Sequence, residues 1–196
     1  IMEYAALVPC AISALIAREI AEMVGAHGEH FTVPASVNFD LKNGALIVLL
    51  ALLCAGVSIL FCEILHRTER FFKTKIENAW LRAVVGGVLI IVLTKLLHTT
   101  DYLGTGMNIV EKAISGETAP EAFLLKMIFT AITLSCGFKG GEIVPTLFVG
   151  ATFGCLFGQI TGISPSLTAA CGMAAVFCGV TNAPISSLLL SFELFG

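Results

Sequence analysis

The sequence has little charge. Only 13% of its 196 residues are Asp, Glu, Lys or Arg, whereas soluble domains average about 25%. Hydrophobic residues make up 57%, and the mean hydropathy is +0.93. Residues 143–192, fifty in a row, contain no Asp, Glu, Lys, Arg or His. This deficit excludes an ordinary soluble domain and indicates a polytopic membrane protein, because a surface that faces lipid must be as apolar as the core.

Other absences narrow the range of functions. The formal net charge of −3 and the lack of a basic stripe exclude a nucleic-acid partner. The seven cysteines form no CxxC pair and have no zinc-ligand spacing. We therefore expect no metal site and no cofactor, and we interpret the cysteines as small hydrophobic residues inside helices. The N-terminus lacks the basic segment and cleavage pattern of a secretory signal peptide.

Hydrophobic runs predict an all-α fold with about eight helices. The clearest run is 45–62, eighteen uncharged residues that are long enough to span a bilayer. The basic segment 66–75 is predicted to be a solvated loop that faces the cytoplasm, by the positive-inside rule. We expect the other helices over residues 5–26, 80–97, 103–114, 119–136, 146–160, 165–178 and 184–195.

Prolines divide the C-terminal half. The last three predicted helices begin at Pro145, Pro165 and Pro184, and each has about 11–16 residues against the roughly 20 needed to span a bilayer. Short helices of this kind are typical of tilted or broken helices whose ends meet at a buried ion site. One long hydrophobic stretch that is kinked twice is the alternative. Asn182 is interpreted as a capping residue beside the last proline.

Two local patterns predict packing and helix starts. Gly150, Gly154 and Gly158 recur at every fourth residue and therefore line one face of a helix. This stripe predicts close packing against a neighbouring helix. Thr118 and Glu121 match a capping box that would begin the helix 119–136.

The stretch GFKGGEIVP interrupts the apolar region. Two glycines free the backbone before a helix that is predicted to start at Pro145. The N–H groups ahead of that proline have no intrahelical partner, and the helix end carries about half a unit of positive charge. Such an end binds a small anion without a full counter-charge that would prevent its release. The predicted anion-binding residues are Gly140, Gly141, Glu142, Ile143, Val144 and Pro145.

Glu142 is the least expected member of this set, because a carboxylate repels an anion. A charged residue at membrane depth indicates a function. Its carboxyl group would be protonated, turned toward water, or used to carry a proton in exchange. The alternative is an ion pair with Lys139 at a water-exposed rim.

GFKGGEIVPTLFVGATFG resembles the GxFxP-type selectivity-filter region of the ClC chloride channels and proton-coupled anion antiporters. DYLGTGMNI and TNAPISSLLLSFE are similar to stretches before and after that filter. The resemblance covers essentially the whole chain and corresponds to the second half of a ClC membrane domain. It implies that residues 1–196 are a single fragment of that domain, without its first half and final helices. It also implies a multi-pass protein of a bacterial plasma (inner) membrane, embedded in the lipid bilayer, and a homodimer in the full-length parent.

The resemblance implies transport of chloride or a related small anion by a channel or an H⁺/anion antiporter. The N–H groups of Glu142 and Ile143 would hold the anion, and Ile143 stands where the family usually has phenylalanine. A glutamate at position 142 is similar to the fluoride-transporting branch, whose motif often reads GGEVTP, but Val144 replaces its threonine. Chloride is therefore the preferred prediction, and a fluoride/proton antiporter is the alternative. Glu142 and Glu29 are the candidates for proton coupling, with His30 in the same linker as Glu29.

Three rival functions are weaker. A membrane-embedded enzyme with Glu142 or Glu193 as acid or base lacks any partner such as an HExxH or GxSxG motif, so we expect that the protein is not an enzyme. A cation-coupled transporter would direct the carbonyl ends of its helices toward the ion. Here the glycines precede the proline, which indicates that the N–H end of a helix faces the ion. The third possibility is a packing or dimerisation module without activity.

Overall fold

The computed structural model describes residues 7–25, 31–32 and 40–195, and these residues form eight α-helices and no strand. The all-α prediction is confirmed. The chain divides into a unit of residues 1–30 and a unit of residues 31–196. The first contains α1 (Leu7–Met23). The second contains α2 (Leu41–Lys75), α3 (Ala79–Leu97), α4 (Met107–Ile114), α5 (Ala122–Ser135), α6 (Ile143–Thr161), α7 (Pro165–Thr181) and α8 (Pro184–Phe195).

Helix α2 is longer than predicted, because the basic segment 66–75 continues it. The prediction of a loop there is wrong. No glycine or proline interrupts residues 57–75, and Arg, Lys and Glu have high helix propensity. Their charges pair along the helix surface at i,i+4 spacing, Arg67 with Glu63 and Lys73 with Glu69, each at 2.5 Å.

Helix α6 begins at Ile143, with Glu142 as its N-cap, so the predicted start at Pro145 is wrong. Pro145 is the third helical residue. Proline is tolerated there because the N–H that it lacks would have no intrahelical partner in the first turn. The other two proline starts, at Pro165 and Pro184, are confirmed.

The last three helices are separate elements and not one kinked stretch. Helix α6 ends at Gly162, with φ of 78°, and α7 ends at Asn182, with φ of 52°. Both residues are in the left-handed conformation that terminates helices. Asn182 is therefore a capping residue, as predicted, at the end of α7.

The predicted starts of α4 and α5 need correction. Helix α4 begins at Met107 and not at residue 103, with Gly106 as its N-cap. Helix α5 begins at Ala122 without a side-chain cap, so the capping box is absent. The Thr118 hydroxyl instead contacts the carbonyl oxygen of Ala119 at 3.4 Å, while the Ala122 N–H donates to that same oxygen at 3.1 Å.

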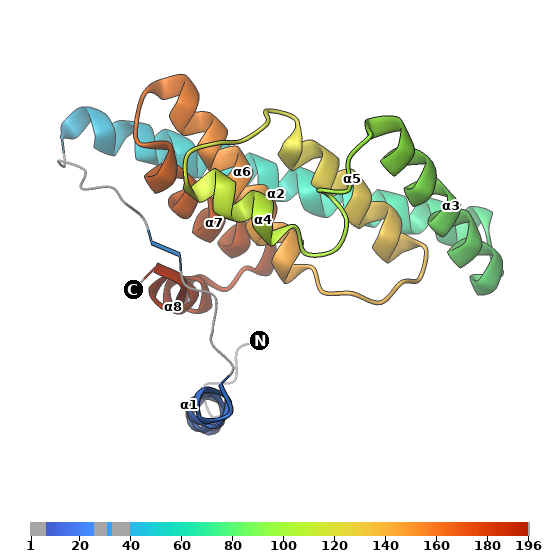
Figure 1. Ribbon diagram of the computed structural model, residues 1–196, viewed down its shortest axis with the longest axis horizontal. Helices are drawn as coiled ribbons and strands as arrows, with labels where there is room; N and C mark the ends of the chain where they lie inside the picture. The colour runs from blue at the N-terminus through green and yellow to red at the C-terminus, as the bar shows by residue number, and fades with distance from the viewer. Residues whose placement is uncertain (1–6, 26–30, 33–39, 196) are drawn as a thin grey trace. The chain divides into compact units, whose positions relative to one another are not determined.

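The glycine stripe of α6 packs against the backbone of α7, which confirms the packing prediction (Figure 1). A Cβ at Gly150 would lie 2.5 Å from the carbonyl oxygen of Gly172, and one at Gly154 would lie 2.1 Å from that of Thr168. No Cβ fits at such distances, so the two helices touch through their backbones. The first half of α6 is also covered on its other faces, because residues 146–152 are all buried.

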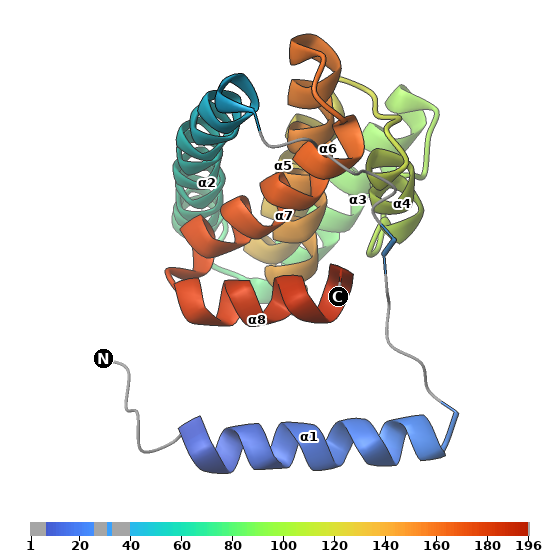
Figure 2. The ribbon, with the colours of Figure 1, turned by 90° about the vertical axis from the view of Figure 1, so that its left-hand side faces the viewer.

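Helices α2, α5, α6 and α7 enclose one apolar core of the second unit (Figure 1), and α4, α5, α6 and α7 contribute to another. Helix α8 runs across the direction of α2 (Figure 2). On another side, α3 packs on α5, with Gly86 against Cys136. Helices α2, α3 and α6 are long and apolar enough to cross a membrane, and the exposed side of α3 carries Val84, Val88 and Ile91.

Candidate functional site

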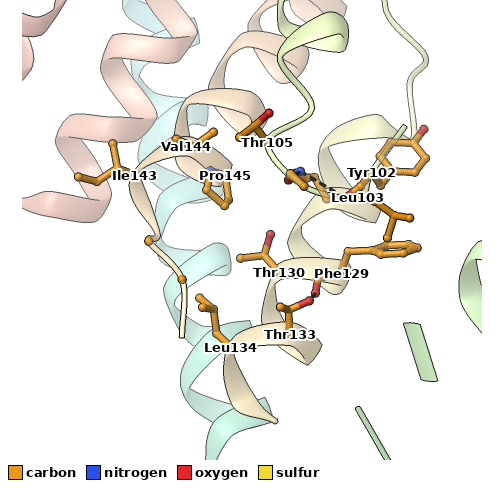
Figure 3. A pocket seen from close by; sticks show the side chains of 14 residues that line it. Tyr102, Leu103, Thr105, Phe129, Thr130, Thr133, Leu134, Ile143, Val144 and Pro145 are labelled. Atoms are coloured by element: carbon orange, nitrogen blue, oxygen red, sulfur yellow. Dashed lines mark hydrogen bonds between the residues drawn. The ribbon is translucent and has the colours of Figure 1, made fainter. Parts of the chain in front are cut away.

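A pocket of about 600 Å³ lies where α5, the start of α6 and the segment 102–105 meet (Figure 3). Five lining residues come from α5, five from the stretch 140–145, and four from the segment 102–105. The sequence motif and the DYLGTG stretch therefore face the same space. Side chains of Thr105, Val144 and Pro145 lie on one side of it, and Thr130 and Thr133 lie on another (Figure 3).

The first turn of α6, beside this pocket, has N–H groups without partners. Within the described residues, the N–H groups of Glu142, Ile143 and Val144 have no hydrogen-bond acceptor. The first intrahelical bond runs from the Thr146 N–H to the Glu142 carbonyl oxygen at 3.0 Å, and the Thr146 hydroxyl donates to the same oxygen at 2.6 Å. The helix end thus offers three free donors and the positive end of its dipole.

Helix α5 presents one face to the pocket. The lining residues from α5 follow a helical repeat of three and four, which places them on one stripe: Lys126, Phe129, Thr130, Thr133 and Leu134. The Thr133 hydroxyl donates to the Phe129 carbonyl oxygen at 2.7 Å. The buried Thr130 hydroxyl makes no hydrogen bond to any described residue, so it remains available to a bound molecule.

Lys126 is the one charged residue of α5, and it is only 1% exposed. Its Nζ donates to the carbonyl oxygens of Tyr102 at 3.2 Å and Gly104 at 2.7 Å. It also lies 4.9 Å from the ring centroid of the buried Phe148 of α6. The sequence analysis overlooked this residue, although a single lysine within an apolar helix is a signal of function in itself.

The structure brings five of the six predicted anion-binding residues to the pocket wall and leaves one outside it. Glu142 does not line the pocket; it is exposed, within electrostatic range of the Cys62 thiol on α2. Both Glu142 and Lys139 are described, and they form no ion pair. Glu29 and His30 lie outside the described residues.

Comparison with known proteins identifies the family of the chain. A family model described as "Voltage gated chloride channel" matches residues 1–196. The chloride/fluoride channel protein of Pseudomonas syringae pv. tomato is 31% identical over 201 residues, which cover 100% of this chain and 44% of that protein. The voltage-gated ClC-type chloride channel ClcB of Escherichia coli O17:K52:H18 is 29% identical over 100% of this chain and 49% of its own length.

A solved structure shares the fold. The crystal structure of a CLC-type fluoride/proton antiporter superposes with a TM-score of 0.93 at 26% identity, over 98% of this chain and 49% of that chain. The chain therefore spans about half the length of the relatives that it matches. Since the family model covers all 196 residues, the chain belongs to the voltage-gated chloride channel (ClC) family of integral membrane proteins.

Proposed function

We propose that this chain is part of a transporter that moves chloride or fluoride across a membrane, and that the anion binds at the N-terminus of α6. The observation that carries the proposal is the set of three N–H groups without acceptors at the start of α6, two of which, those of Ile143 and Val144, belong to residues that line the pocket. A helix N-terminus stabilises an anion through these donors and its dipole, with no formal positive charge in contact. Gly140 and Gly141 complete that wall without adding side-chain bulk.

Fluoride/proton exchange is the second candidate, and two observations favour it. Glu142 stands in the motif at the helix start, exposed and beside the bound anion's expected path. The relatives include a chloride/fluoride channel protein and a CLC-type fluoride/proton antiporter. A carboxyl group that is open to water exchanges protons rapidly, so Glu142 is our proposed proton carrier, with Glu29 as a further candidate.

The remaining proposals follow from the family. We propose that residues 1–196 form one fragment of a longer membrane domain, that the complete protein is a homodimer, and that it resides in the plasma membrane of a bacterium. We also propose that it is a transporter without enzymatic activity.

The test is an efflux assay with the complete transporter that carries this sequence. Liposomes are loaded with potassium chloride or potassium fluoride, efflux is started with valinomycin, and ion-selective electrodes record each halide with and without a proton gradient. Efflux of either halide is expected, and the halide that moves decides between the candidates. If a cation moves and neither halide does, the proposal is wrong.

A set of variants tests the site itself. Ile143→Pro removes one N–H of the helix end, and Ile143→Ala keeps it; a third variant, Val144→Pro, removes the next N–H, so that a backbone shift at Glu142 is told apart from the loss of a donor. Loss of one hydrogen bond to an ion reduces affinity about tenfold or more. We expect that loss in Ile143→Pro and less than about a threefold change in Ile143→Ala, with both proteins monodisperse on gel filtration. Equal transport by the two Ile143 variants would contradict an anion site at these N–H groups.

A further inference from the structure

We propose that Lys126 supplies a fixed positive charge to the anion pathway and, through the same ammonium group, holds the segment 102–105 in place as a wall of the pocket. This inference rests on the proposed function, since it concerns how the same pocket attracts its anion. No part of the sequence motif contains Lys126, which lies sixteen residues before Glu142.

The contacts of Lys126 are those of a charged ammonium group. Such a group has three donors and no acceptor. In the structure, its nitrogen faces two carbonyl oxygens, at 2.7 and 3.2 Å, and the π face of Phe148 at 4.9 Å. All three partners carry negative partial charge toward it and none offers a proton. These contacts therefore suit an ammonium group and offset part of the cost of burying it.

The charge of Lys126 is not cancelled by any acidic side chain. Among the described residues, no Asp or Glu forms an ion pair with Lys126, and its partners are backbone dipoles and a neutral ring. Dipoles stabilise an ion locally but leave its net charge unchanged. Because Lys126 is 1% exposed, little water surrounds its ammonium group to screen the charge. A buried charge without a counter-ion acts over a longer range than one in water.

This charge faces the pocket that contains the α6 amides. Lys126 lines the pocket together with Thr130, whose hydroxyl has no acceptor within the described chain and lies one helical turn further along α5. The start of α6 and one face of α5, which carries the ammonium group and the hydroxyl, thus line the same pocket. An anion placed there becomes the counter-ion that Lys126 lacks, without a direct bond that would slow its release.

Lys126 also fixes the shape of the opposite wall. The segment 102–105 belongs to no helix, and its Gly104 has φ of 60°, a left-handed conformation. Two bonds from one ammonium group fix the carbonyl oxygens on either side of Leu103. The aromatic rings of Tyr102 and Phe148 contact each other edge to face at 6.4 Å and close the space behind it.

Three substitutions of Lys126 in the complete transporter separate the effect of its charge from the effect of its hydrogen bonds to the pocket wall. Lys126→Met removes both the charge and the donors, Lys126→Gln keeps a donor without charge, and Lys126→Arg keeps both. The exposed Lys95 of α3 provides the matched control, Lys95→Gln. Halide efflux from liposomes is measured against internal halide concentration, so that the apparent affinity and the maximal rate are obtained separately.

We expect Lys126→Met and Lys126→Gln to weaken the apparent halide affinity about tenfold or more, with a smaller effect on the maximal rate. Lys126→Arg and Lys95→Gln should stay within about threefold of the unsubstituted protein. If Lys126→Gln retains the full affinity, the charge has no role and the inference is wrong. The unsubstituted transporter is measured before any variant. If it moves no halide, the proposed function is wrong, and this outcome is distinct from a failure of the inference about Lys126.

A second measurement uses the unsubstituted protein and does not depend on the folding of a variant. Crystals of the complete transporter are soaked in bromide, and anomalous scattering locates the ion. A bromide peak inside the pocket, between Lys126 and the first turn of α6, supports the inference. A peak confined to another site, or no peak at all, overturns it.

Discussion

Gly154 on α6 is the position where the contact between α6 and α7 is most sensitive to one added methyl group. A Cβ there would lie 2.1 Å from the carbonyl oxygen of Thr168 and 3.0 Å from the Cα of Ala169. Both are backbone atoms of α7, so no side-chain rotation relieves the overlap. To reach a tolerated carbon–oxygen contact, the two helices must separate by about 1 Å.

We expect Gly154→Ala to lower the free energy of unfolding by about 2 kcal/mol. Overpacking of this kind costs about 3 kcal/mol, and the higher helix propensity of alanine offsets about 1 kcal/mol of it. For a transporter about twice as long as this chain, as its relatives are, the melting temperature should fall by about 2–4 °C. The separation also displaces α6, whose first turn forms the pocket wall, so the halide affinity should fall as well.

The assay is thermal unfolding of the complete transporter in detergent, followed by gel filtration. The matched control is Gly87→Ala on α3, because a Cβ there meets nothing within 4 Å. This variant should melt at the same temperature as the unsubstituted protein or slightly above it. The reciprocal variant Gly172→Ala, whose Cβ would lie 2.5 Å from the Gly150 carbonyl oxygen, should behave like Gly154→Ala. If Gly154→Ala and Gly87→Ala melt together, α6 and α7 are not in backbone contact.

Three further outcomes are expected. Gly106→Ala should lower the free energy of unfolding by about 2 kcal/mol in a thermal melt, because φ is 72° and the added Cβ would lie 2.7 Å from the Phe148 ring. Gly104→Ala adds its Cβ in open space and should cost about half as much. Equal losses in the two variants would refute the role of the ring. Asn78→Ala should cost about 1 kcal/mol, because the Asn78 side chain caps the second N–H of α3 at 3.0 Å, while Asn78→Ser should restore most of it. Thr130→Val should weaken halide affinity about threefold to tenfold in the efflux assay, and an unchanged affinity would show that its hydroxyl does not meet the anion.

The sequence was sufficient for the fold class and for most helices, because long apolar runs and helix-ending glycines act locally. It was insufficient for four boundaries, the end of α2 and the starts of α4, α5 and α6, and two of these show the reason. The segment 66–75 looked like a loop because its charges stand close together, yet those charges pair along one helix face. Pro145 looked like the first residue of a helix. Proline also fits the third residue of a helix, and only the backbone geometry distinguishes these two positions.

For the candidate site, the sequence identified the part of the pocket wall that is formed by consecutive residues. Gly140, Gly141 and the start of α6 could be found because a glycine pair before a helix is a local signal. Lys126 could not be placed by spacing, since its partners Tyr102 and Gly104 precede it by 24 and 22 residues and meet it only in the folded protein. Its isolation within an apolar helix was nevertheless visible in the sequence.

The length of α2 sets the level of the pocket relative to the membrane. Its uncharged part, 45–62, measures about 27 Å at 1.5 Å per residue, close to the roughly 30 Å of a hydrocarbon core. The remaining charged turns, 63–75, add about 20 Å and must stand in the headgroups and water. Cys62 therefore marks the boundary between lipid and water, and Glu142 lies within electrostatic range of its thiol.

The length of α2 thus indicates the depth at which α6 begins in the membrane. At this level the exposed side chain of Glu142 avoids the penalty that hydrocarbon imposes on a polar group. Under the proposed function, an anion would reach the α6 amides at this level, close to the boundary between lipid and water.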